Sequence, residues 1–217
     1  MNAENEDKIG LWGTGTALAL FVLIVTGAVC LALNLRILYY ADIRLLDLPE
    51  ASGLEADVIR ENYDALIDYN LLWHRGELYF PTLPMSVTGK IHFEEVKRIF
   101  DGIQIAFWIS IPVCLGLCIP LLGNGKKRFF FLTGILCIAI PAALLTALLA
   151  NWEKFFITFH ELVFNNDYWW FDPVTDPVIE ILPDAYFEQC AVLIVAVTLL
   201  CGFICLRLGR RRRPITI

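Results

Sequence analysis

Two histidines, His92 and His160, carry the side chains best suited to proton transfer in this sequence. The chain has three histidines in all, and the third, His74, lies among turn formers in the stretch WHRGELYFPTLP, which makes it the weakest candidate. An imidazole titrates near neutral pH, so it can serve as a general base, as a general acid or as a hydrogen-bond donor to an oxyanion. We therefore take His92 and His160 as candidate catalytic residues.

The stretch that begins at His160 also contains carboxylates and aromatic side chains. It runs through NNDYWWFDPVTDP, where Asp172 and Asp176 each precede a proline. Each proline fixes its own φ and moves the preceding aspartate out of the helical region, which predicts a rigid acidic turn. Asp172 or Asp176 could orient an imidazole, and Trp170 belongs to a type of side chain that favours the boundary between membrane and water.

A second group of candidates lies on the predicted amphipathic helix 54–72, LEADVIRENYDALIDYNLL. Its apolar residues recur at helical spacing, and Tyr63 and Asn70 are seven residues apart on one face. With Arg60, they are candidates for binding a lipid head group or an oxyanion. The alternative, which spacing alone favours for Tyr63 and Asn70, is that they only pack an external helix.

The elements that must position these residues are dominated by apolar helices. Of the 217 residues, 58% are hydrophobic and 18% are charged, and the mean hydropathy is +0.62, which is outside the range of ordinary soluble domains. Four apolar runs approach the ~20 residues that cross a bilayer. We predict an all-α integral membrane protein, a single membrane domain over residues 1–217. Its transmembrane helices are expected at residues 11–33, 103–122, 129–150 and 187–206.

The first apolar run is expected to be a retained helix. It is longer than the apolar core of a signal peptide, which has ~7 to 15 residues, and the flank before it is acidic. The seven cysteines lie in or beside the apolar runs, so a disulfide framework is not expected.

Charge divides the connecting segments into two sets. Those on the side of the termini hold nine basic and three acidic residues, whereas those on the other side, together with Glu188, hold eight basic and twenty acidic residues. Basic flanks mark the cytoplasmic side, and Arg210 to Arg213 fit this topology and anionic lipid better than a nucleic-acid site. We predict cytoplasmic segments at 1–10, 123–128 and 207–217, and an extracellular cap of short helices and loops at 34–102 and 151–186.

Helical spacing places the two candidate histidines at similar depth. His92 shares a helix face with Val96 and Ile99, just before the second apolar run, in a helix that starts at Ser86 or Thr88. The third run is expected to continue past Ala150 as one helix, through NWEKFFITFHELVF to His160. Both imidazoles would then lie at the outer membrane interface.

Several stretches resemble one family, the lipoprotein intramolecular transacylases, which are four-span membrane proteins of Gram-positive bacteria. The similarity rests on the external helix RENYDALIDYN, on a histidine followed by an acidic-Val-Lys run, and on a series after the third apolar run. Gly89 stands where the family often has the glutamate of a Ser-x-x-Glu helix start, and Glu95 stands where it often has aspartate. The matching positions are His92, Glu95, Val96, Lys97, Phe159, His160, Trp170, Phe171, Asp172, Pro173, Asp176, Pro183 and Phe187.

This resemblance implies an acyltransferase in the bacterial cell membrane. Its reaction would move the sn-2 acyl chain of a diacylglyceryl-cysteine lipoprotein to the α-amine of the same N-terminal cysteine, leaving a lyso-form lipoprotein. Ester aminolysis needs a base for the amine, a donor for the oxyanion and a proton for the leaving alkoxide. We assign His160, by slight preference, as base and His92 as acid or oxyanion donor, on the extracellular face, with diacylated lipoproteins and membrane lipid as partners and no nucleic acid.

Other functions remain open from the residues alone. A non-enzymatic membrane protein could bind a partner, a lipid or zinc through its acidic outer loops, since two histidines and a carboxylate form a known zinc ligand set. We predict no metal and no cofactor. Haem ligation is disfavoured because no histidine lies deep in an apolar run, and a transporter is disfavoured because the runs lack ionisable residues.

Overall fold

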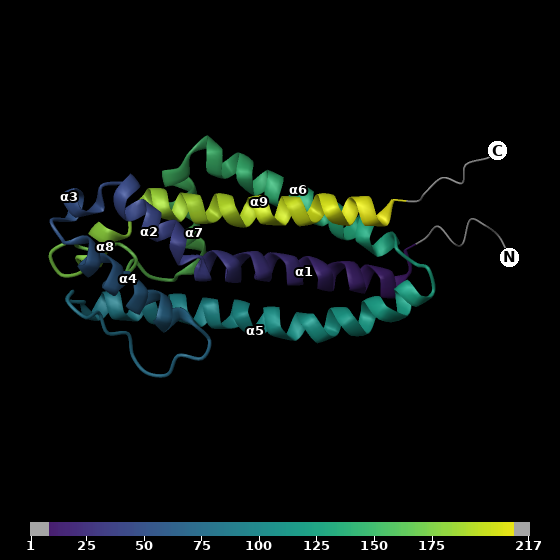
Figure 1. The fold of residues 1–217 in the computed structure, drawn as a ribbon, viewed down its shortest axis with the longest axis horizontal. Coiled ribbons are helices and arrows are strands. Elements are labelled where there is room, and N and C mark those ends of the chain that lie inside the picture. The colour runs from purple at the N-terminus through teal and green to yellow at the C-terminus, as the bar shows by residue number, and fades with distance from the viewer. Residues whose placement is uncertain (1–8, 211–217) are drawn as a thin grey trace. The chain divides into compact units, whose positions relative to one another are not determined.

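The structure is a computed structural model that describes residues 9–210, and Figure 1 shows its chain path. Within these residues the chain forms nine helices and no strand. The acidic flank at 1–8 and the arginines at 211–213, on which the predicted topology partly rests, lie outside the described residues. The helices are α1 Leu11–Asn34, α2 Arg36–Leu45, α3 Leu48–Ser52, α4 Ala56–Asn70, α5 Val87–Gly123, α6 Arg128–Ala150, α7 Trp152–Val163, α8 Val178–Ile181 and α9 Asp184–Gly209.

Four of the helices, α1, α5, α6 and α9, are long and apolar enough to cross a membrane. Each contains one of the four predicted apolar runs. Helix α5 has 37 residues, many more than the ~20 that span a bilayer. Its apolar part begins near Ile103, so the first part of α5, which carries His92, extends beyond the membrane-spanning segment.

The chain divides into two compact units. One combines the chain up to Val29 with Ala106–Thr146 and the chain from Ile194 onward, and it is built from apolar helix segments. In this unit Thr133 Oγ1 donates to the carbonyl of Ala17 at 3.2 Å. A Cβ on Gly134 would lie only 2.8 Å from the Gly202 carbonyl oxygen, so α6 and α9 approach closely because both residues are glycine.

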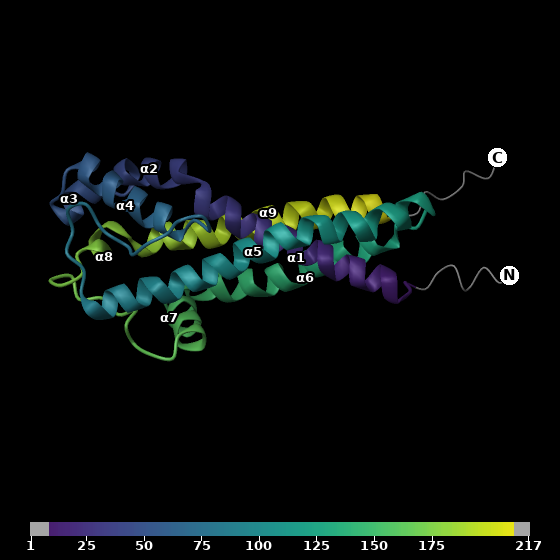
Figure 2. The same ribbon diagram turned by 90° about the horizontal axis from the view of Figure 1, so that it is seen from below.

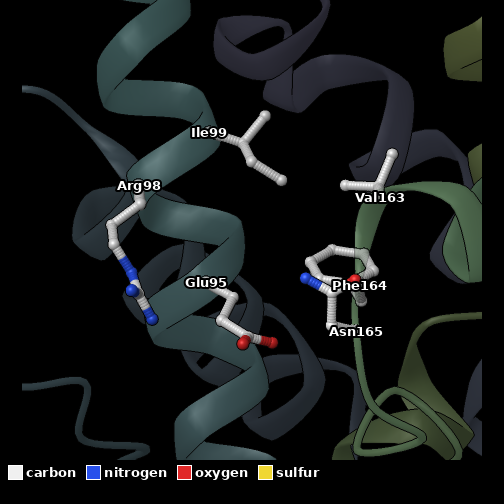
Figure 3. A pocket seen from close by; sticks show the side chains of 6 residues that line it. All are labelled: Glu95, Arg98, Ile99, Val163, Phe164 and Asn165. Atoms are coloured by element: carbon white, nitrogen blue, oxygen red, sulfur yellow. The ribbon is translucent and has the colours of Figure 1, made fainter.

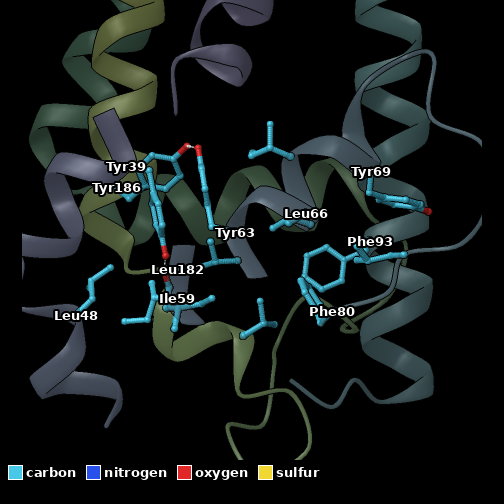
Figure 4. Close-up of a cluster of buried hydrophobic side chains, with 14 of the residues drawn as sticks. Tyr39, Leu48, Ile59, Tyr63, Leu66, Tyr69, Phe80, Phe93, Leu182 and Tyr186 are labelled. Atoms are coloured by element: carbon cyan, nitrogen blue, oxygen red, sulfur yellow. Dashed lines mark hydrogen bonds between the residues drawn. The ribbon is translucent and has the colours of Figure 1, made fainter. Parts of the chain in front are cut away.

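The other unit combines Cys30–Ile105 with Ala147–Leu193 and contains the short helices. Its core is a cluster of buried side chains in which three tyrosines meet (Figure 4). Tyr39 and Tyr63 stack with ring centroids 3.6 Å apart, and the hydroxyls of Tyr63 and Tyr186 are hydrogen-bonded at 2.7 Å. This pairing satisfies buried hydroxyls that would otherwise destabilise an apolar core.

Helix α6 ends at Ala150 and a new helix, α7, begins at Trp152, so the prediction of one helix running past Ala150 is wrong. Asn151 has φ −166° and ψ 101°, which is extended backbone, and its side-chain oxygen accepts the N–H of Lys154 at 2.8 Å. Asparagine is among the best N-cap residues, so it starts a new helix within an otherwise apolar sequence. His160 is therefore carried by the separate helix α7, seen beside the first part of α5 in Figure 2.

The start of α5 is fixed by a residue far away in the sequence. Ser86, one of the two predicted caps, accepts the N–H of Gly89 on its Oγ at 2.9 Å. Asp176 Oδ1 accepts the N–H of Ser86 at 2.8 Å. In a capping box the residue at the position of Gly89 would supply that carboxylate itself. Here Asp176 supplies it from another segment, and a Cβ on Gly89 would lie 2.3 Å from Asp176 Oδ1.

Candidate active site

The structure brings His92 of α5 and His160 of α7 together, with ring centroids 6.1 Å apart and planes inclined by 35°. The two residues are 68 positions apart in the sequence, so only the fold makes them neighbours. The separation leaves the rings adjacent without a direct hydrogen bond between them. A reacting group held beside both rings could exchange protons with one and donate or accept a hydrogen bond with the other.

The tautomer of neutral His160 follows from its hydrogen bond. Its Nδ1 lies 2.8 Å from the carbonyl oxygen of Phe156, one helical turn earlier. A carbonyl oxygen only accepts, so Nδ1 carries the proton and donates it. Nε2 of the neutral ring then holds a lone pair, which is the arrangement that a general base requires.

His92 is almost completely buried, with 5% of its surface exposed. Burial, together with the nearby His160, lowers the pKa of His92 to about 4. Its Nδ1 is buried and has no hydrogen-bond partner within residues 9–210. Burial also lowers the pKa of His160, although its bond to the Phe156 carbonyl acts in the opposite direction. Both imidazoles are therefore neutral at pH 7.

Aromatic side chains surround the pair. Phe164 contacts both rings, at centroid distances of 4.8 Å from His92 and 5.6 Å from His160. Trp169 packs on His160 at 4.8 Å, and Phe171 packs on His92 at 5.5 Å. This surface excludes water from the rings, which is the physical cause of the lowered pKa values.

A polar link ties α5 to the segment that follows α7. The side-chain amide of Asn166 donates to both carboxylate oxygens of Glu95, at 3.0 and 3.1 Å. The backbone carbonyl of Asn166 accepts the indole N–H of Trp169 at 3.1 Å. Because Glu95 follows His92 by one helical turn and Trp169 packs on His160, this link connects the surroundings of the two histidines.

The two predicted aspartates do not contact the imidazoles through hydrogen bonds. Asp172 Oδ1 accepts the N–H of Val174 at 2.9 Å in an exposed turn. Asp176 is buried and binds Ser86 and the hydroxyl of Thr175. A role in orienting a histidine ring directly is therefore unsupported, whereas Asp176 acts on the helix that carries His92.

Trp170, the predicted interfacial aromatic, is 70% exposed and packs edge-on against Trp169. Its neighbour Trp169 is the tryptophan that contacts His160. Of the two adjacent tryptophans, Trp169 and not Trp170 therefore contacts the candidate site. An exposed Trp170 remains suited to the membrane boundary.

The candidates on α4 lie in the core or on the surface instead. Tyr63 belongs to the tyrosine cluster, and Asn70 donates to the carbonyl of Leu66 at 2.9 Å, so the packing alternative describes both better. The Asn70 side-chain oxygen is buried and has no partner in the described part of the chain. The guanidinium of Arg60 lies 3.9 Å above the ring of Tyr40.

Five residues of the site were missed as candidates, although some of them belong to the motifs quoted for the family resemblance. The clearest available signal was Phe164, which follows His160 by four residues and so shares its helix face. Nothing in the sequence showed that a loop would return to contact α5. The missed residues are Glu95, Phe164, Asn166, Trp169 and Phe171.

The zinc alternative can be compared with this geometry. Across residues 9–210, no three or more His, Cys, Asp or Glu side chains are grouped so that they could hold a metal ion. Of the two predicted aspartates, Asp176 is occupied at the start of α5 and Asp172 accepts the N–H of Val174. A ligand set of His92, His160 and an aspartate is therefore not formed in this structure.

Four long apolar helices and a pair of neutral histidines, of which His92 is buried and His160 is half-buried, define this chain as an integral membrane protein with a candidate site for acid–base chemistry. The family model for the lipoprotein intramolecular transacylase Lit matches residues 14–187, and the chain belongs to this family. A comparison with curated proteins gives no match.

Solved structures agree with this assignment. The chain is 34% identical to the membrane integral lipoprotein intramolecular transacylase Lit from Bacillus cereus, with a TM-score of 0.89 over 95% of each chain. Two structures of that protein with a histidine replaced by arginine or alanine are each 35% identical, with a TM-score of 0.82. Each match covers 92% of this chain, together with 89% of the chain of the arginine variant and 91% of the chain of the alanine variant.

These comparisons confirm several predictions. The protein is an all-α, multi-pass membrane protein with four transmembrane helices, and it is an enzyme, a lipoprotein intramolecular transacylase. Its substrate is a lipoprotein. The alternative of a non-enzymatic binding protein is therefore set aside.

Proposed function

We propose that this enzyme moves the sn-2 acyl chain of a diacylglyceryl-cysteine lipoprotein to the α-amine of the same cysteine, with His160 as general base and His92 as oxyanion donor. The observation that carries this proposal is the pairing of His92 with His160 at 6.1 Å, where the Nδ1 bond of His160 leaves Nε2 free. The substrate would be a diacylated lipoprotein held in membrane lipid.

The reaction needs no external reagent. The cysteine nitrogen attacks the carbonyl carbon of the sn-2 ester, and an N–C bond forms as the C–O bond to glycerol breaks. One proton leaves the nitrogen and one proton reaches the released glycerol oxygen, so the total mass is unchanged. Since donor and acceptor are parts of one molecule, holding them in contact can contribute up to ~7 to 11 kcal/mol.

His160 suits the base because its free Nε2 can accept the proton of the attacking amine and return it to the alkoxide. A neutral ring at pH 7 is needed for this step, and burial keeps it neutral. No step of this chemistry is assigned to Asp172, Asp176, Tyr63, Asn70, Arg60 or Trp170.

His92 suits the oxyanion donor better than the general acid. With a pKa of about 4, it is neutral at pH 7 and has no excess proton to give away. A neutral imidazole still donates one N–H, and a preorganised donor in a dry site is worth about 2.7–4 kcal/mol in the transition state.

The reaction would take place on the extracellular face of the cell membrane, with both chain termini in the cytoplasm. The support is the charge of the connecting segments, which are basic on the side of the termini and acidic on the side that holds both histidines. His92 precedes the apolar stretch of α5 by about three turns, so it lies outside the stretch that would cross the membrane.

Mass spectrometry of a synthetic diacylglyceryl lipopeptide tests the proposal. Two lipopeptides that differ in peptide and in isotope label at the sn-2 chain are incubated together with the detergent-solubilised protein. We expect each chain to appear on the cysteine nitrogen of its own peptide with no change in mass. Labelled chains on the other peptide, or released fatty acid, would contradict an intramolecular transfer. A lipopeptide with an N-acetylated cysteine is the control, since it cannot accept the chain.

A further inference from the structure

A pocket of about 190 Å³ lies between α5 and the segment after α7 (Figure 3). Glu95, Arg98 and Ile99 line it from α5, and Val163, Phe164 and Asn165 line it from the other side. In Figure 3 the Glu95 carboxylate points from the helix toward Phe164 and Asn165. The pocket thus combines apolar walls with one acidic and one basic side chain.

This pocket adjoins the candidate active site. Phe164 lines it and also contacts both His92 and His160. Glu95 follows His92 by three residues, so the two side chains lie on neighbouring positions of one helix face. A group bound by Glu95 is therefore within one helical turn of the histidine pair.

The Glu95 carboxylate is fixed but not saturated. Asn166 donates to both of its oxygens, which holds the side chain in place. A carboxylate has about four acceptor positions, so some remain. Among the residues that the structure describes, Glu95 forms no salt bridge, and the Arg98 Nε donates to the Glu94 carbonyl at 3.2 Å. The pocket therefore holds an oriented anionic group without a cationic partner.

We propose that Glu95 binds the α-ammonium group of the substrate's N-terminal cysteine. The inference rests on the proposed function, in which this nitrogen is the acceptor of the acyl chain. A free α-amino group has a pKa of roughly 7.7–8.0, so the substrate arrives mainly as a cation with three N–H donors, and this cation releases one proton to water before the neutral amine attacks the ester. After transfer, the nitrogen is part of a neutral amide, and its attraction to Glu95 is lost. Glu95 would thus distinguish substrate from product.

The test uses two probes that cannot react, because both chains are joined to glycerol by ethers. One dialkylglyceryl lipopeptide has a free α-amine, and the other has an N-acetylated cysteine. We expect the wild-type protein to bind the free-amine probe about 10-fold more tightly, as for a charged hydrogen bond. Glu95→Gln should remove this preference and leave the affinity for the acetylated probe within about 2-fold.

Two variants serve as controls. Glu94→Gln removes a carboxylate from the exposed side of the same helix and should keep the preference. Glu95→Asp keeps the negative charge and should keep part of the preference for the free-amine probe. The inference is overturned if wild type shows no preference, or if Glu95→Gln weakens both probes equally, which would indicate a structural role. If the wild-type protein does not transfer the acyl chain of the ester substrate, the proposed function fails, whatever the binding data show.

Discussion

At the scale of single residues, burial decides how the two histidines behave. A water-excluding aromatic surface surrounds them, and it keeps both rings neutral where a solvated imidazole would begin to protonate. The hydrogen bond of His160 to Phe156 then decides which nitrogen is free. Proton transfer is thus prepared by neutral side chains and a backbone carbonyl, and within residues 9–210 neither ring donates a hydrogen bond to a carboxylate.

The lowered pKa of His92 predicts how stability depends on pH. The unfolded chain binds a proton at His92 below about 6.5, whereas the folded protein binds it only below about 4. Neutral His92 therefore contributes about 3 kcal/mol to the free energy of unfolding above pH 6.5, and this contribution is lost as the pH falls toward 4. We expect the Tm in detergent to fall more steeply for wild type than for His92→Phe between pH 6.5 and 4.5. Parallel curves would contradict this.

Residue types alone identified His92 and His160, because few side chains titrate near neutrality and only three histidines exist. They did not identify Glu95 or Asn166, whose hydrogen bonds join positions 71 residues apart. The aspartates were misjudged for the same reason. Whether Asp176 meets an imidazole or a helix start depends on tertiary contacts that no local pattern contains.

At the scale of elements, the start of α5 links the acidic turn to His92. Asp176 binds the N–H of Ser86, and Phe171 from the same segment packs on His92. The side chain of Asp176 thus positions the helix rather than the imidazole. The loss of such a cap typically costs 0.5–2 kcal/mol.

This arrangement predicts a rescue. Asp176→Ala should lower the rate of acyl transfer, and Gly89→Glu should also lower it, because its Cβ collides with Asp176. The double variant should recover much of the rate, since the glutamate introduced at position 89 would complete a capping box with Ser86 from within α5. Transfer rates of the three variants are compared by mass spectrometry. A double variant no better than Asp176→Ala alone would show that Asp176 does not act through the cap.

The long helices were predictable because a bilayer demands continuous apolar runs of a set length. The break of the helix at Asn151 was not predictable, because apolar residues continue on both sides of it and a single side-chain cap starts the new helix. The consequence for the site is large, because α7 can take its own direction and bring His160 to His92.

At the scale of the whole molecule, charge asymmetry predicts the topology, and labelling can test it. Val174, which is 84% exposed, lies in a predicted outer loop, and Asn124 lies in the predicted cytoplasmic turn between α5 and α6. A membrane-impermeant maleimide should label Val174→Cys in intact cells, whereas Asn124→Cys should require permeabilised cells. Wild type, with its seven native cysteines, gives the background. The reverse pattern would invert the proposed orientation.

The pairing of helices and the tyrosine core were beyond sequence reasoning for this chain. Apolar periodicity shows which segments enter the membrane, but all faces of such helices are apolar, so their neighbours are not specified. The close approach of Gly134 and Gly202 is visible only in the structure. Composition thus predicted the class of protein, and the tertiary fold supplied the site.

The central claim is that His92 and His160 together carry the acyl transfer, and their alanine variants test it most directly. Transfer in a single turnover is measured by mass spectrometry for His92→Ala, His160→Ala and His74→Ala. His74 is the matched control, because it packs on Tyr69 at 5.5 Å. We expect each of the first two to lose at least ~100-fold in rate and the third to stay within about 2-fold. Near-normal transfer by either His92→Ala or His160→Ala would contradict the mechanism.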